Sequence, residues 1–136
     1  MAEAVFRHHA VQHGIADQLE IDSAGTGHWH VGNLPHNGTL SVLASNGILT
    51  NHRARQIHPR DLNHYDYIIV MDRDNKRDVE LLGLGAADVR LMMEFGPDSG
   101  PDEVPDPYYT GEFGLVFELV EAASLGLITE IKQRLA

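Results

Sequence analysis

Cysteine is absent from the 136 residues of this chain, and its absence excludes several kinds of chemistry. Without a thiol, these residues provide no disulfide, no thiolate metal site and no cysteine nucleophile. No apolar run approaches the roughly 18 residues that a membrane-spanning helix needs. Residues 1–7 contain an acid at Glu3 and no long apolar stretch, which is not typical of a signal peptide. We therefore expect a cytoplasmic protein that does not enter a membrane.

Positive charge is also scarce. The sequence has 10 Lys and Arg against 20 Asp and Glu, which gives a formal net charge of −10. Such a chain repels phosphate backbones, so nucleic-acid binding is disfavoured, whereas a small anionic substrate is compatible with a few converging arginines. The length fits one domain, since domains cluster around roughly 100–150 residues. We expect a single domain over residues 1–136.

Helix-like and strand-like segments alternate along the chain. Helices are predicted where apolar residues recur three and four positions apart or where capping residues flank a helix-forming run: 1–13, 39–46, 72–82 and 113–135. Strands are predicted over 19–23, 67–71 and 89–95, of which the second is apolar throughout, as in a strand buried on both faces. The segments 25–38 and 96–111, which are rich in glycine or proline, are expected to be loops. This alternation predicts a parallel α/β sheet with its ligand site at the carboxyl ends of the strands.

Two motifs invite a cofactor or a metal ion. Gly25-Thr-Gly27 follows a predicted strand, as in a dinucleotide-binding loop, but His30 replaces the third glycine and no helix pattern begins there. A plain glycine loop is the better interpretation. His8, His9 and His13 could meet on one helix, yet no His-Glu-x-x-His frame or third ligand is present. We expect surface histidines, no metal site and no cofactor.

Two further motifs have alternative interpretations. Residues 52–55, His-Arg-Ala-Arg, are a solvated stretch that pairs with nearby acids or, alternatively, line an anion site; the first is favoured. Asp106-Pro-Tyr-Tyr109 begins a turn. An aspartate held by a proline beside aromatic side chains also suits a general acid for an aromatic substrate. For this second motif, both interpretations stay open.

Several stretches, in their order and spacing, resemble one family over essentially the whole chain. They are MAEAVFR (1–7), DSAGT (22–26), WHVG (29–32), ARQI (54–57), DYIIVMD (66–72), Asn75 and DPYY (106–109). With these motifs the chain resembles the low-molecular-weight protein tyrosine phosphatases. The resemblance implies a three-layer, flavodoxin-like α/β fold, in which a four-stranded parallel sheet has helices on both faces.

The resemblance also implies an activity and a set of site residues. The family hydrolyses phosphate monoesters of phosphotyrosine proteins or aryl phosphates without a cofactor, through a phosphocysteine intermediate. An aspartate protonates the leaving oxygen and then activates water. The matching positions are Asp106 as this acid and base, Trp29, Tyr108 and Tyr109 as walls for the phosphotyrosine ring, Ser23 and His52 as braces of the phosphate loop, and Asp72 near that loop.

One departure from the family is large. Its nucleophile loop, Cys followed by five residues, Arg and Ser-Pro, immediately precedes the helix that here begins at Met1. The resemblance therefore implies that the first strand and the nucleophile are missing, and we expect these 136 residues alone to be inactive. In the family the first strand lies inside the sheet, so two strands here lose backbone partners, and self-association could replace them.

Three hypotheses follow. The first is a tyrosine phosphatase whose start was assigned too late, at an internal methionine, because every downstream catalytic and bracing position is present. The second is a pseudophosphatase that binds a phosphoprotein or a partner strand without turnover. The third is an arsenate reductase, which can share the fold but needs additional cysteines for its thiol relay. The first is favoured.

Overall fold

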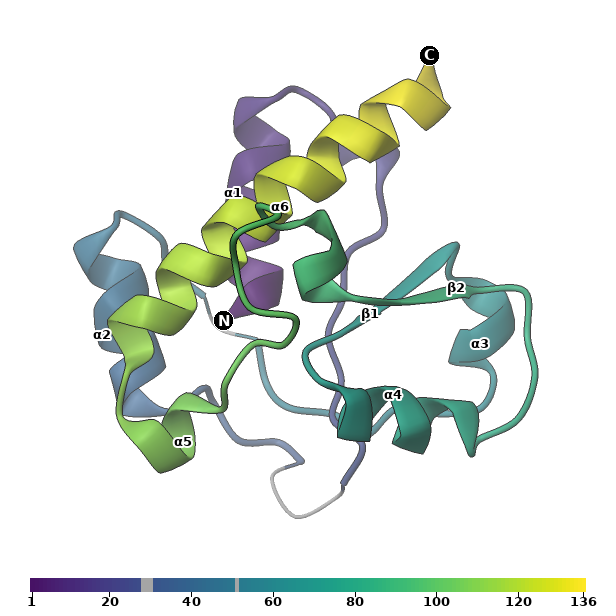
Figure 1. Ribbon diagram of the computed structural model, residues 1–136, viewed down its shortest axis with the longest axis horizontal. Helices are drawn as coiled ribbons and strands as arrows, with labels where there is room; N and C mark the ends of the chain where they lie inside the picture. Colours follow the sequence, from purple (N-terminus) through teal and green to yellow (C-terminus); the bar gives the residue numbers. More distant parts are fainter. Residues whose placement is uncertain (28–30, 51) are drawn as a thin grey trace.

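The computed structural model describes residues 1–27, 31–50 and 52–136. Its elements, in chain order, are α1 (Ala2–Gln12), η1 (Ala16–Gln18), α2 (Asn37–Ser45), α3 (Asp61–His64), β1 (Tyr67–Val70), α4 (Arg73–Glu80), β2 (Asp88–Leu91), η2 (Met92–Phe95), α5 (Pro107–Thr110) and α6 (Phe113–Leu135). Figure 1 shows α1 and α6 on one side of the two strands and α3 and α4 on the other. No helix in these residues is long and apolar enough to span a membrane.

The two strands form a parallel sheet. β1 and β2 pair along their whole length, with Tyr67 opposite Asp88. The predicted strand at 67–71 is thus confirmed, and the one at 89–95 is confirmed in its first half. This second strand ends early because the Glu94 carboxylate accepts a hydrogen bond from the Leu91 amide at 2.6 Å, which turns the chain into the 3₁₀ helix η2.

The strand predicted at 19–23 is wrong. Leu19 has extended backbone angles, but within the described ranges the segment joins no strand ladder, and the nearest pairing is one parallel bridge between Gly25 and Gln56. The Arg7 guanidinium donates a hydrogen bond to the Ile21 carbonyl instead. A strand consists of hydrogen bonds to a neighbour, so alternating polarity alone does not produce one.

Side chains of β1 alternate between two apolar layers, as a pleated strand requires. Tyr67 and Ile69 pack against the cluster between α1 and α6, whereas Ile68 and Val70 pack with Leu62 of α3 and with α4. The expected packing on both faces is therefore confirmed. The helices cover β1 only in part, because Val70 is the one β1 residue that is buried.

The long helix α6 contributes most of the core, and its prediction is confirmed. Its buried side chains recur at helical spacing and comprise Val116, Phe117, Val120, Ala123, Ser124, Leu127, Ile128 and Ile131. The first part of this stripe packs with Val5 of α1 and Leu43 of α2, and the second with Ala10 of α1. The α1 and α4 helices also form where the sequence predicts them.

Capping side chains set the starts of three helices. α2 begins two residues before the predicted 39–46 because the His36 ring accepts a hydrogen bond from the Gly38 amide at 2.9 Å. Asp72 caps α4 in the same way, at the carboxyl end of β1. The expected loop 96–111 contains the short helix α5, which Asp106 caps and Pro107 starts. These caps place Asp72 and Asp106 at helix N-termini.

Candidate functional site

A cavity of about 690 Å³ lies at the carboxyl end of β1. Asp72 and Asp106 both line it, and Val104, Leu115 and Leu119 are among its apolar walls. The backbone brings the two acids together because Val104 donates its amide hydrogen to the Met71 carbonyl at 2.9 Å. This bond joins the loop before α5 to the end of β1. The carboxyl edge of the sheet thus carries a hollow, as parallel α/β sheets favour.

Asp106 is fixed by the turn that it starts. Its Oδ1 accepts a hydrogen bond from the Tyr108 amide at 2.9 Å, while Pro107 fills the first helical position. The carboxylate stays exposed. Tyr108 and Tyr109 are 68% and 84% exposed, and their ring centroids lie 5.5 Å apart in an edge-to-face arrangement. Both rings can therefore contact a ligand, whereas a role in core packing is excluded for them.

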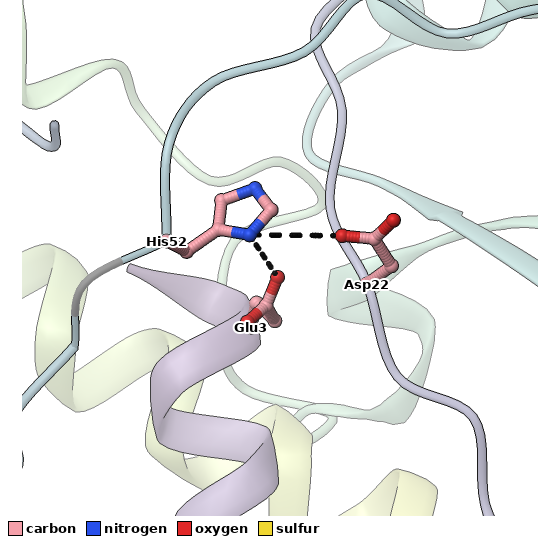
Figure 2. Close-up of side chains that lie close together, drawn as sticks. All are labelled: Glu3, Asp22 and His52. Atoms are coloured by element: carbon pink, nitrogen blue, oxygen red, sulfur yellow. Dashed lines mark ion pairs between the residues drawn. The ribbon is translucent and has the colours of Figure 1, made fainter. Parts of the chain in front are cut away.

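A second group of side chains surrounds the start of α1 (Figure 2). The Ser23 hydroxyl donates to Glu3 Oε1 at 2.9 Å, and His52 Nδ1 lies 3.2 Å from the same oxygen. His52 Nδ1 is also 3.6 Å from Asp22 Oδ1. The other ring nitrogen, Nε2, is buried and has no hydrogen-bond partner in the described residues. Ser23 and His52 thus meet at one carboxylate, although they are far apart in the sequence.

Sequence reasoning missed Glu3 and Asp22 as members of this group. The motifs MAEAVFR and DSAGT contained both, but their side-chain partners depend on the tertiary structure. Ligand atoms of Glu3, Asp22 and His52 lie within 4.8 Å of one another, a spacing that a metal ion could use. Each carboxylate already has a cation, however: Arg7 lies 3.5 Å from Glu3 and Arg55 lies 2.9 Å from Asp22. The group is explained as a charge network without a metal.

Arg55 joins this group to α3. Its Nε donates to Asp22 at 2.9 Å and its Nη1 donates to Asp61 at 3.0 Å. The favoured interpretation of residues 52–55, pairing with nearby acids, is confirmed for Arg55. Burial acts to raise the pKa of Asp61, but hydrogen bonds from the His58 amide and from Arg55 outweigh it, so this pKa lies below its ordinary value.

This network predicts a stability that depends on pH. The folded state lowers the pKa of Asp61, so the ionised carboxylate stabilises the fold. Its contribution to the free energy of unfolding is complete above the ordinary pKa of 3.8 and is lost as the pH falls through the pKa of the folded state. We expect Asp61→Asn to lower the free energy of unfolding by about 1–3 kcal/mol at pH 7. Urea unfolding from pH 7 to pH 3 should show that the difference in free energy of unfolding between the original chain and Asp61→Asn becomes smaller as the pH falls. Asp98→Asn, at an exposed loop acid, is the matched control, and a constant difference at every pH would contradict the prediction.

The remaining candidate residues have simpler placements. Trp29 lies outside the described residues. His9 contacts Glu121 of α6 at 3.0 Å, and Lys132 of α6 lies 3.0 Å from His13, so these two histidines face α6 partners instead of one another. Gly25 to Gly27 forms a turn that precedes no described helix until α2, in line with the plain-loop interpretation.

Comparisons with known proteins agree with this geometry. The family model for low molecular weight phosphotyrosine protein phosphatase matches residues 1–136. The low molecular weight protein-tyrosine-phosphatase YfkJ of Bacillus subtilis is 38% identical over 98% of this chain and 87% of its own length. A low molecular weight phosphotyrosine protein phosphatase of Schizosaccharomyces pombe is 42% identical over 84% of this chain and 75% of its own.

A solved structure extends the likeness to three dimensions. The crystal structure of YfkJ superposes with a TM-score of 0.93 at 37% identity, covering 98% of this chain and 86% of that one. This likeness confirms the predicted three-layer, flavodoxin-like α/β fold, even though the described residues form two of its strands. The relatives are named as protein-tyrosine-phosphatases, which makes this chain an enzyme by family. From its motifs, its fold and these relatives, the chain belongs to the low molecular weight phosphotyrosine protein phosphatases.

Proposed function

We propose that these residues carry the acid, the aromatic walls and the loop braces of a phosphatase that hydrolyses phosphotyrosine in proteins. The observation that supports this most directly is the placement of Asp106. Its exposed carboxylate lines the cavity at the carboxyl end of β1, and the two exposed tyrosine rings follow it in α5. An acid beside aromatic surfaces suits the protonation of a phenolic leaving group.

The proposed reaction has two steps. A cysteine thiolate attacks phosphorus while the protonated Asp106 gives its proton to the tyrosine oxygen, so the P–O bond breaks and an S–P bond forms. The Asp106 carboxylate then takes a proton from water, whose oxygen attacks phosphorus and releases inorganic phosphate and the thiolate. Since the 136 residues contain no cysteine, the nucleophile of this reaction has to come from residues outside them.

The other proposed roles concern position. Tyr108, Tyr109 and Trp29 hold the substrate ring. Ser23 and His52 brace the loop that carries the nucleophile, a role supported by the buried, unpartnered Nε2 of His52. Glu3 accepts a hydrogen bond from Ser23 and contacts His52, and therefore fixes both braces. Asp72, on the same cavity as Asp106, lies beside that loop.

The test compares two chains. One is residues 1–136, and the other is the same chain preceded by the segment translated in frame from the DNA upstream of Met1. We expect hydrolysis of phosphotyrosine by the longer chain and none by the shorter, because only a thiolate can start the reaction. The longer chain with its cysteine changed to serine is the control. A stop codon with no Cys-five-Arg loop upstream, or turnover by residues 1–136, would contradict the proposal.

A second candidate is a non-catalytic module that binds a phosphoprotein or a partner strand. It is supported by the sheet, because in the described residues β1 pairs with β2 alone and offers its other edge. This candidate predicts a discrete oligomer of residues 1–136 in analytical ultracentrifugation, or phosphotyrosine-peptide binding without turnover. A monomer with no such affinity would exclude it. An arsenate reductase is disfavoured because its relay needs further thiols, and these residues contain none.

A further inference from the structure

Three elements meet at the ring of His36, which precedes α2. Its Nδ1 accepts a hydrogen bond from the Gly38 amide at 2.9 Å. The ring stacks on Phe113, the first residue of α6, with centroids 5.0 Å apart and an angle of 14° between the planes. It also forms an edge-to-face pair with the Tyr108 ring in α5, with centroids 6.0 Å apart and an angle of 88° between the planes. Figure 1 shows α5 just below the lower end of α2 and the start of α6.

Phe113 makes this junction firm. A Cβ atom at Gly38 would lie 2.6 Å from the Phe113 ring, so the backbone at the start of α2 is in direct contact with that ring. His36 is thus held on one side by its own helix and on another by α6. His36 and Tyr108 are both exposed, so the bond from the Gly38 amide and the stack on Phe113 are what orient the His36 ring beside Tyr108.

The short helix α5 needs such support. It has four residues, none of which is buried, and its carboxyl end turns at Gly111 with a φ of 73°. Asp106 depends on this helix for its position, because its carboxylate accepts a hydrogen bond from the Tyr108 amide. A contact that fixes Tyr108 therefore also fixes the carboxylate of Asp106.

We propose that His36 is a positioning residue for the general acid: its exposed ring, held by the Gly38 amide and by Phe113, orients Tyr108 and thereby aims Asp106 at the leaving oxygen. This inference rests on the proposed function, since it gives Asp106 the role of the acid. His36 itself does not touch the substrate in this mechanism.

Two variants separate the two interactions of His36. Asn keeps a side-chain oxygen that can cap the Gly38 amide but has no ring, whereas Phe keeps a ring and cannot cap. Both are made in the chain with its nucleophile segment. The values of kcat/KM are measured with phenyl phosphate, whose leaving group needs protonation, and with 4-nitrophenyl phosphate, whose leaving group needs it far less.

We expect the ring to control catalysis and the cap to control stability. His36→Asn should lower kcat/KM for phenyl phosphate by about threefold to tenfold and that for 4-nitrophenyl phosphate by less than about twofold. His36→Phe should keep both rates within about twofold of the original but lower the Tm. Equal rates for His36→Asn and the original chain would overturn the proposal. So would an equal loss on both substrates, because that indicates a general structural effect.

A spectroscopic measurement on residues 1–136 checks the contact without any activity. The ring protons of Tyr108 should shift in the NMR spectrum of His36→Asn, which removes the neighbouring ring current, and shift less in His36→Phe. If Tyr108 does not respond to His36→Asn, the proposed contact is wrong. Failure of the proposed function is recognised separately, by an extended chain in which Asp106→Asn changes neither substrate's rate.

Discussion

Replacing Asp106 by asparagine should lower kcat/KM for phosphotyrosine about 10²–10⁴-fold in the chain with its nucleophile segment. Asparagine keeps the size of the side chain and an oxygen that can still cap α5, so the helix should persist. It cannot give a proton to the leaving oxygen or take one from water. The loss should be largest for substrates with poor leaving groups, and steady-state rates with phenyl and 4-nitrophenyl phosphate measure that dependence.

The neighbouring acid Asp102 provides the control. It lines the same cavity, its side chain is 83% exposed, and it lies 3.7 Å from Arg73. An exposed pair of this kind contributes little, so Asp102→Asn should leave the rates within about twofold. If Asp102→Asn lost as much activity as Asp106→Asn, the effect would belong to the negative charge of the cavity. The assignment of Asp106 as the proton donor would then be wrong.

Replacing Gly126 by alanine should strongly destabilise the fold. A Cβ atom at this position would clash with the carbonyl oxygen of Phe95, so α6 and η2 would have to move apart. We expect the free energy of unfolding to fall by about 3 kcal/mol. The Tm should drop by about 10 °C. Urea and thermal unfolding, followed by circular dichroism, measure both changes.

Gly114 offers a matched control on the same helix. A Cβ atom there would meet nothing within 4 Å, and the residue has ordinary helical geometry in the first turn of α6. Alanine is the better helix former, so Gly114→Ala should raise the free energy of unfolding by up to about 1 kcal/mol. The two substitutions should therefore act in opposite directions. Equal effects would show that α6 does not approach η2 as closely as the structure has it.

Local chemistry explains which parts of the fold could be predicted. The amphipathic spacing of α6 and the apolar run of β1 are patterns that each segment carries by itself. Asp72 and the Asp106-Pro107 pair cap their helices through bonds within three residues, so neighbouring side chains suffice to set these starts. The cap at His36 was missed because histidine is not among the side chains usually preferred there, and α2 therefore began earlier than predicted.

Long-range contacts explain what could not be predicted. The segment 19–23 has the alternation of a strand, but a strand needs a neighbour, and none lies beside it in the described ranges. The contacts within the candidate site also join segments that are distant in the sequence. Family motifs pointed to Ser23 and His52, yet their meeting at Glu3 depends on how α1 packs, and the junction of His36 with Tyr108 and Phe113 joins three separate elements.

The sequence by itself determined the family, the alternation of helices and strands, and the fact that these 136 residues have no thiol. Each of these depends on residue identity and local order. The tertiary structure decided which side chains share a cavity, which carboxylate Ser23 and His52 both contact, and which ring lies against Tyr108. These contacts depend on packing between segments that are distant in the chain. The hydrophobic pattern of one segment does not identify the segment against which it packs.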